Sequence, residues 1–341
     1  MLTGLQSGRA VAAIMVAIFH ANLFLLPKNF YDGNGAGAVF NFGYAGVEFF
    51  FVLSGFIMML VHRQDFGRPE RMGLFLYKRV VRIYPIYWMV LTFLVAIYIA
   101  APTRGPDHAR EPLSILASYL LWPTEDGPIM AVAWTLQHEM LFYLIFATLL
   151  WRVRIGAVLF GAWMVACVAA LPFYGQITHP LEFFLKPHNL LFAMGIGTAL
   201  LYDRVAVGTA RLLFWAGLAL FLGTGVAETV GEVPFPRGPL PLIYGLGAAL
   251  MMVGLTRGAL PSPRWLTFLG DASYSIYLVH LPAMNILAVF LKRAGIHEVL
   301  PPLAMLTLVV TLVTVIGCIV HVMIEKPLMA WFKARAATVQ A

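Results

Sequence analysis

The chain has 341 residues, of which 61% are hydrophobic and only 11% carry a charge. A soluble domain carries about 25% charged residues, so this composition indicates a membrane protein. The net charge of +7 is compatible with a nucleic-acid partner, but most lysines and arginines fall in short segments between apolar runs, where membrane topology explains them. We therefore expect a lipid bilayer around the chain and no nucleic-acid partner.

The sequence predicts no metal centre and no tightly bound cofactor. The two cysteines, Cys167 and Cys318, both lie inside apolar runs, which argues against a disulfide framework or a thiolate metal site. His138 and Glu139 begin a stretch similar to a zinc-hydrolase motif, but Phe142 stands where the second histidine is needed.

Ten segments are long and apolar enough to be candidate membrane spans, which need about 20 mostly apolar residues each. They lie near 8–27, 40–61, 83–101, 131–150, 155–172, 187–202, 211–228, 239–256, 271–291 and 302–322. The sixth is the shortest. This pattern predicts an all-α, polytopic helical bundle that forms a single domain over residues 1–341.

Loop charges predict the orientation of the bundle. The segment 63–82 is rich in Arg and Lys, and alternate loops and the C-terminal tail continue the trend. By the positive-inside rule both termini are cytoplasmic, in a multi-pass protein of the inner (plasma) membrane. Lys292 and Arg293 are the exception, because they fall in a loop on the outer side.

Ionisable residues inside the predicted spans are the first functional signal. Arg9 and His20 share the first span, and a step of eleven residues places them on one helical stripe about 16 Å apart. Glu48, Glu139 and His280 are also predicted to lie within the membrane, where each charged group costs at least ~2.5 kcal/mol. Such residues need partners or water, so together they predict a water-accessible polar interior.

Each of these residues also has a purely structural interpretation. A single histidine such as His20 can join two helices by a hydrogen bond, and Arg9 can extend to the cytoplasmic interface. Arg79 and Arg82 fit ordinary positive-inside anchors. The face shared by Ser273, Tyr277 and His280 fits a polar packing seam.

Six motifs, in order from residue 5 to 327, resemble those of the acyltransferase 3 family of polytopic membrane acyltransferases. They are Arg9-x10-His20; GYAGVEFFFVLSGF with Glu48 and Ser54; KRVVRIYPIYW with Arg79, Arg82 and Pro85; WTLQHEMLFY with Trp134, Glu139 and Tyr143; LGDASYSIYLVH with Ser273, Tyr277 and His280; and IEKP. The likeness is greatest to the ExoZ-like branch, which acetylates bacterial exopolysaccharides. The family motif assigns no role to His138.

The resemblance implies transfer of an acyl group, usually acetyl from acetyl-coenzyme A, to a sugar hydroxyl of a glycan. It also implies that His20 is the key catalytic residue and that arginines bind the donor. We expect Arg79 and Arg82 to bind the phosphates of acyl-CoA at the inner face, with Arg9 adding a contact. His20 is then the general base, and Glu139, or less favourably Glu48, orients its ring.

Several alternatives stay open on sequence alone. Transfer through an acyl-His20 intermediate uses the same residues as direct transfer. Buried ionisable groups in ten spans also fit a transporter or flippase for a glycolipid or small anion, although we detect no internal repeat of the kind common in transporters. The acceptor, the acyl chain, the side on which the acceptor binds and a homo-oligomeric state are not specified by the sequence.

Overall fold

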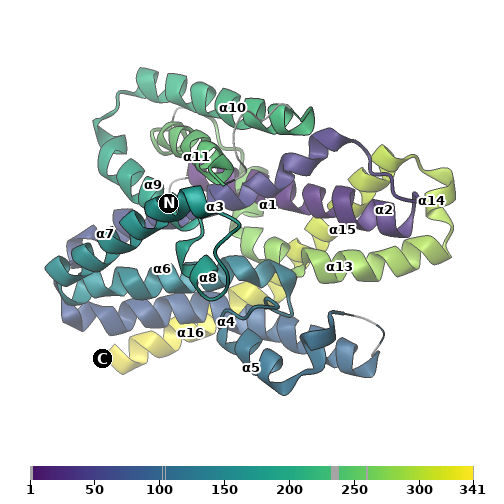
Figure 1. Ribbon diagram of the computed structural model, residues 1–341, viewed down its shortest axis with the longest axis horizontal. Coiled ribbons are helices and arrows are strands. Elements are labelled where there is room, and N and C mark those ends of the chain that lie inside the picture. The colour runs from purple at the N-terminus through teal and green to yellow at the C-terminus, as the bar shows by residue number, and fades with distance from the viewer. Residues whose placement is uncertain (1–2, 102, 104, 232–237, 259, 341) are drawn as a thin grey trace.

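The computed structural model describes residues 3–101, 103, 105–231, 238–258 and 260–340, and every regular element in these ranges is a helix (Figure 1). The helices are α1 (Thr3–His20), α2 (Leu26–Asn29), α3 (Gly46–His62), α4 (Pro69–Ala100), α5 (Pro112–Leu120), α6 (Trp134–Trp151), α7 (Val153–Ala170), α8 (Leu181–Leu185), α9 (Asn189–Leu201), α10 (Val207–Thr229), α11 (Leu240–Thr256), α12 (Arg264–Asp271), α13 (Ser273–Arg293), α14 (Ile296–Val299), α15 (Pro302–Val320) and α16 (Lys326–Gln340). The predicted all-α bundle is confirmed.

Seven helical stretches in the described part of the chain are long and apolar enough to cross a membrane, and each overlaps one predicted span. The predicted number of ten is not confirmed. The fourth, sixth and eighth candidates form α6, α9 and α11, which do not meet the same criteria of length and hydropathy. α9 has 13 residues and α11 has 17, and α6 carries Gln137, His138 and Glu139 in its first turns.

Helix α1 lies in the middle of the bundle, against α3, α11, α12 and α13 (Figure 1). Its small residues Ala10, Ala13 and Ala17 are at most 1% exposed. Helices in lipid associate where small side chains let their backbones approach, because hydrophobicity alone gives no driving force there. The packing of α1 therefore carries Arg9 and His20 into the protein interior.

Glycines set an equally close approach between α3 and α9. A Cβ atom on Gly195 would lie 1.9 Å from the carbonyl oxygen of Val52, and one on Gly55 would lie 2.1 Å from that of Phe192. No side chain fits at either position without moving a backbone. This contact fixes the helix that carries Glu48 and Ser54.

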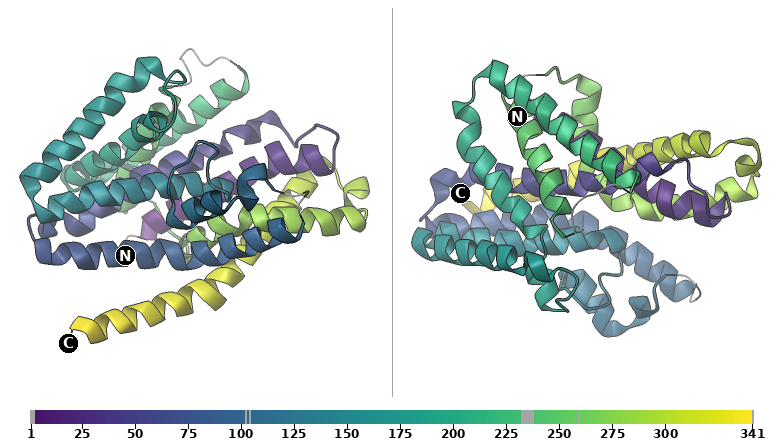
Figure 2. Two further views of the ribbon diagram at one scale, coloured as in Figure 1. Left: turned by 60° about the horizontal axis from the view of Figure 1, so that its bottom comes forward. Right: turned by 45° about the horizontal axis from the view of Figure 1, so that its top comes forward.

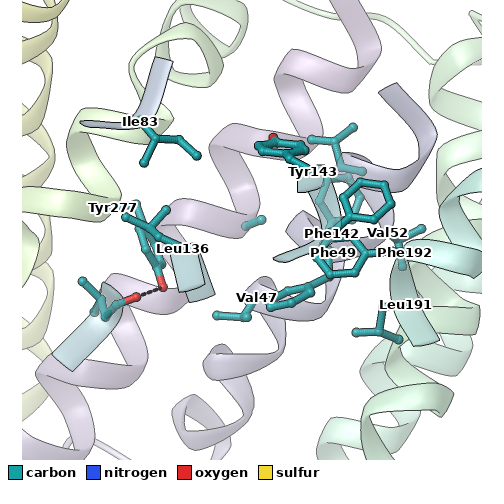
Figure 3. Close-up of a cluster of buried hydrophobic side chains, with 14 of the residues drawn as sticks. Val47, Phe49, Val52, Ile83, Leu136, Phe142, Tyr143, Leu191, Phe192 and Tyr277 are labelled. Atoms are coloured by element: carbon teal, nitrogen blue, oxygen red, sulfur yellow. Dashed lines mark hydrogen bonds between the residues drawn. The ribbon is translucent and has the colours of Figure 1, made fainter. Parts of the chain in front are cut away.

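Helix α4 packs against α6, and the C-terminal helix α16 runs beside α4 (Figure 2). Aromatic residues join α6 to α9: the rings of Phe142 and Phe192 stack with centroids 4.2 Å apart and an interplanar angle of 6° (Figure 3). Because α9 is fixed to α3, this stack also fixes the distance between α6 and α3. These two helices form part of the cavity described below.

Two five-residue π-helices interrupt the α-helical pattern. η1 (Ala21–Leu25) continues α1 directly after His20, and η8 (His321–Glu325) continues α15. Single π-turns inside α-helices are rare and occur frequently at functional sites. We call the end of the bundle where α1 begins and α3 ends the basic face, and the end where α1 passes into η1 the opposite face.

Candidate active site

Three arginines that the sequence predicts to bind the donor, Arg9, Arg79 and Arg82, line one cavity of about 1290 Å³. This volume exceeds the roughly 300–1,000 Å³ typical of small-molecule sites. Exposed lysines of α4 and α16 also line the cavity, so it opens at the basic face. Its α3 lining extends from Val47 to Val61, a length of about 21 Å along the helix. The space is long enough for an extended ligand.

Arg82 is held in the cavity wall by a buried carboxylate. Its Nη1 forms an ion pair with Glu325 of η8, whose side chain is only 1% exposed. Glu325 also accepts hydrogen bonds from Ser275 Oγ at 2.7 Å and from His321 Nδ1 at 2.8 Å. A buried carboxylate with three donors is well satisfied. The guanidinium also lies 5.0 Å from the ring centroid of Tyr274.

Arg79 and Arg9 are held differently. The Arg79 guanidinium lies over the rings of Phe75 and Tyr143, 5.6 and 5.7 Å from their centroids. Arg9 Nη1 donates to Gln6 Oε1 at 3.1 Å. Neither arginine forms an ion pair with a residue in the described part of the chain. In that part of the chain, no carboxylate therefore pairs with the guanidinium of Arg9 or of Arg79.

The deep end of the cavity is lined by Val47, Phe50, Thr135 and Tyr277. The Tyr277 hydroxyl donates to the carbonyl oxygen of Val132 at 3.0 Å and lies 2.9 Å from the Thr135 hydroxyl. Figure 3 shows Tyr277 beside Leu136, across the cluster from Phe142 and Phe192. The cavity wall is thus cationic near the basic face, whereas at the deep end it is apolar and carries hydroxyl groups.

His20 and His280 form a pair next to this deep end. Nδ1 of His20 lies 2.9 Å from the carbonyl oxygen of Val16 and 3.2 Å from Nε2 of His280. Nδ1 of His280 lies 2.5 Å from the carbonyl oxygen of Tyr277. The predicted helix face that carries Tyr277 and His280 is therefore turned toward α1.

These contacts assign the protons on both rings. A carbonyl oxygen only accepts, so Nδ1 carries the hydrogen in His20 and in His280 when each ring is neutral. Nε2 of His280 is then an acceptor for Nδ1–H of His20. Nε2 of His20 bears a lone pair and has no hydrogen-bond partner among the described residues. The pair thus presents one basic nitrogen.

His20 is half-buried and does not line the cavity, within the part of the chain that the structure describes. Tyr277 links the two regions, because it lines the cavity and its ring centroid lies 5.7 Å from that of His280. On its other side His20 contacts the ring of Phe24 in η1, which is 55% exposed. His20 therefore lies between the deep end of the cavity and the opposite face.

The structure brings Glu139 to the cavity and gives it partners other than His20. Its Oε1 accepts a hydrogen bond from Ser54 Oγ at 2.6 Å and another from the Tyr143 hydroxyl. The expected contact with His20 is thus absent in the described residues, because His280 occupies the place beside the imidazole. Glu139 and Ser54 both line the cavity.

Glu48 lies in a second buried group, near the start of α3. It is 1% exposed, its Oε1 lies 3.6 Å from Nε2 of His188, and neither carboxylate oxygen has a hydrogen-bond partner among the described residues. Trp134 packs edge-on against His188 with centroids 5.2 Å apart. His138 is also buried here, with Nδ1 2.9 Å from Asn189 Oδ1. These contacts do not include His20.

Two residues of the site, Glu325 and His188, carried no role in the sequence prediction. Glu325 lies in the IEKP motif, but the signal that it faces inward is the π-turn of η8, which no hydrophobic period reveals. His188 lies at the start of the sixth predicted span, near 187–202, and belongs to no motif. Ser273 was predicted as part of the polar interior; it is fully buried and lines the cavity, and its hydroxyl has no partner among the described residues.

The apolar helices, the long cavity and the histidine pair within the bundle define a membrane acyltransferase when they are combined with the family comparison. The sequence model of the family described as "Acyltransferase domain" matches residues 2–323. The chain belongs to this acyltransferase family.

Two curated proteins are similar to the chain. "Exopolysaccharide production protein ExoZ" of Rhizobium meliloti (strain 1021) is 33% identical over 329 residues, which cover 91% of this chain and 96% of that protein. "Putative acetyltransferase ORF330" of Acidianus two-tailed virus is 26% identical over 296 residues, or 82% of this chain and 83% of that protein. No solved structure matches.

Proposed function

We propose that the protein transfers an acyl group, usually acetyl, from cytoplasmic acyl-CoA to a sugar hydroxyl of an exopolysaccharide or other glycan. The observation that carries this proposal is the cavity with Arg9, Arg79 and Arg82 in its wall and Tyr277 at its deep end, next to the His20–His280 pair. The printed name of the relative from Rhizobium meliloti, which concerns exopolysaccharide production, supports the glycan acceptor.

The donor enters from the basic face, which the positive-inside rule makes cytoplasmic in an inner-membrane protein. Arg79 and Arg82 bind its phosphate oxygens, a task that suits the planar guanidinium. Arg9 adds a contact to the phosphate or to the pantetheine arm in this proposal. The slender arm then runs along α3 and brings the thioester to the deep end, beside Tyr277.

His20 acts as general base through Nε2. It removes the proton of the acceptor hydroxyl as the sugar oxygen attacks the thioester carbon, and the carbon–sulfur bond then breaks. The departing thiolate of CoA takes the proton from His20, so the histidine returns to its neutral state. During transfer the His20 imidazolium keeps its Nδ1–H bond to His280 Nε2, which stabilises the positive charge.

The acceptor reaches His20 from the opposite face, where the half-buried ring meets Phe24 of η1. This route keeps the two substrates on separate paths that converge at one nitrogen. Attack of His20 itself on the thioester, to form an acyl-His20 intermediate, uses the same two paths. A transporter, in contrast, moves a glycolipid or anion without consuming a thioester.

Mass spectrometry of surface glycans tests the proposal. Cells that produce the wild-type chain are expected to carry O-acyl esters, and cells that produce His20→Ala at the same membrane level are expected to lack them. Equal ester content in the two strains would contradict the enzymatic role of His20. Accumulation of unmodified glycan on the inner side of the membrane in the variant would instead support transport.

A further inference from the structure

We propose that helix α16 forms the nucleotide end of the donor site and that Lys326 and Lys333, with Lys78 of α4, bind the 3′-phosphate of coenzyme A. This inference rests on the proposed function and extends it to three lysines and to one named phosphate. It also gives the C-terminal helix a role in donor binding. From its charges alone, this segment was predicted only to be a cytoplasmic tail.

The two ends of the cavity differ in burial and in charge. Thr135 and Tyr277 at the deep end are buried, whereas Lys78, Lys326 and Lys333 are exposed and also belong to the lining. Exposed lining residues mark the entrance of a cavity. The entrance therefore lies between α4 and the first half of α16.

The direction of the cavity decides which end of the ligand lies at this entrance. The lining follows α3 from Val47 to Val61, a length of about 21 Å. A thioester that reaches Tyr277 leaves the opposite end of the molecule near the exposed lysines. In coenzyme A that end is the adenosine with its 3′-phosphate.

The three lysines have charge available for a phosphate. No ion pair in the described part of the chain involves any of these lysines. A phosphate monoester carries about −1.5 to −2 charge at pH 7. Lysine binds such a group as a compact point charge and needs no fixed geometry.

The spacing in α16 directs these residues to one side. Lys326, Met329 and Lys333 recur at steps of three and four, so they share one helix face, and all three line the cavity. Phe332 lines it too, and its carbonyl oxygen accepts a hydrogen bond of 3.3 Å from the hydroxyl of Tyr77 in α4. The two aromatic residues give the entrance flat apolar surfaces on which a nucleobase stacks.

Arg335 supplies a matched control in the same helix. It lies nine residues after Lys326, which is about 180° around the helix axis. Its guanidinium stacks over the ring of Trp331, 4.0 Å from the centroid, and neither residue lines the cavity. Arg335→Ala removes the same unit of charge from α16 at a residue outside the cavity lining.

The experiment compares acetyl-CoA with acetyl-3′-dephospho-CoA as donors for the purified protein in nanodiscs of neutral lipid. Wild type is expected to show a lower KM for acetyl-CoA. Lys326→Ala and Lys333→Ala should each raise the KM for acetyl-CoA about tenfold, the effect of losing a hydrogen bond to a charged group, and leave the KM for the dephospho donor as it was. Arg335→Ala should change neither value.

Other outcomes separate this inference from the function on which it rests. If wild type transfers acetyl from both donors with the same KM, the inference is overturned and the proposed function stands. The same holds if the lysine variants differ from wild type only in nanodiscs with anionic lipid, which would assign the lysines to lipid phosphates. If wild type transfers from neither donor, the proposed function fails and the inference with it.

Discussion

His20 and His280, 260 positions apart in the sequence, meet across α1 and α13 with Nδ1 of the first 3.2 Å from Nε2 of the second. Backbone carbonyls fix the proton on Nδ1 of both rings. The result is a chain of donors and acceptors that ends in one free basic nitrogen, Nε2 of His20. In serine hydrolases a carboxylate supports the imidazole in the corresponding way; here a neutral ring takes that position.

The first prediction concerns this contact. His280→Ala removes one of two acceptors for Nδ1–H of His20 and leaves the carbonyl oxygen of Val16 as the other. The loss matters most when His20 is positively charged. We expect kcat to fall about 10- to 100-fold, the range for one hydrogen bond to a charged group, with the KM for acetyl-CoA unchanged. Steady-state transfer assays measure both constants. His280→Gln, which keeps an acceptor oxygen, should recover part of kcat; no recovery would contradict the hydrogen-bond role.

The second prediction separates Glu139 from the histidine pair. Tyr143→Phe and Ser54→Ala each remove one donor to Glu139 Oε1 and so loosen the cavity wall. We expect the KM for acetyl-CoA to rise about three- to tenfold, the effect of a single hydrogen bond, with a smaller change in kcat. The opposite pattern in Glu139→Gln, a fall in kcat at constant KM, would show that Glu139 acts in catalysis, as the sequence predicts.

The third prediction concerns the ion pair between Arg82 and Glu325. Arg82→Ala leaves a carboxylate that is 1% exposed without its cation, so the free energy of unfolding should fall. We expect a loss of about 3 kcal/mol, the lower end for breaking a buried pair, because the Arg82 side chain is 32% exposed.

Thermal unfolding in detergent reports this loss. The double variant Arg82→Ala with Glu325→Ala serves as the control, because it removes the unpaired charge together with its partner. Its Tm should lie above that of Arg82→Ala alone. If Arg82→Ala unfolds at the wild-type temperature, the pair has no structural role and Arg82 serves the donor alone.

The fourth prediction tests the contact between α3 and α9. In Gly195→Ala the new Cβ would lie 1.9 Å from the Val52 carbonyl oxygen, so the helices must separate. We expect a lower Tm and a loss of transfer activity, because α3 lines the donor cavity. Gly197→Ala, in the same helix, has nothing within 4 Å of its Cβ and should behave as wild type. Equal Tm values for the two variants would show that α3 and α9 are not tightly packed.

Much of the fold follows from hydropathy alone. Each of the ten predicted spans became a helix, because a run of apolar residues in a bilayer has to satisfy its backbone hydrogen bonds within the segment. The predicted number of ten spans is not confirmed, because α9 and α11 are short and α6 carries polar residues in its first turns. Hydropathy describes each segment by itself and contains no information on how neighbouring helices pack around a short one.

The site could be predicted only in part. Arg9, Arg79 and Arg82 were singled out because they stand in motifs that resemble those of the acyltransferase 3 family, and all three line one cavity. The sequence does not reveal the partner of His20. Glu139 and His280 both lie in predicted spans, and only the packing of α13 against α1 places His280 beside the imidazole. Glu325 was beyond prediction for a similar reason, because a π-turn directs it inward.

The most direct test of the account measures CoA release by the purified protein in nanodiscs, with acetyl-CoA and a glycan acceptor, for wild type and His20→Ala. General-base catalysis contributes a factor of about 10² to 10⁴. We therefore expect His20→Ala to release CoA at least about 10²-fold more slowly than wild type. Calorimetry should show that the variant binds CoA with unchanged affinity. CoA release by His20→Ala at the wild-type rate would contradict the central claim that Nε2 of His20 accepts the proton of the acceptor hydroxyl.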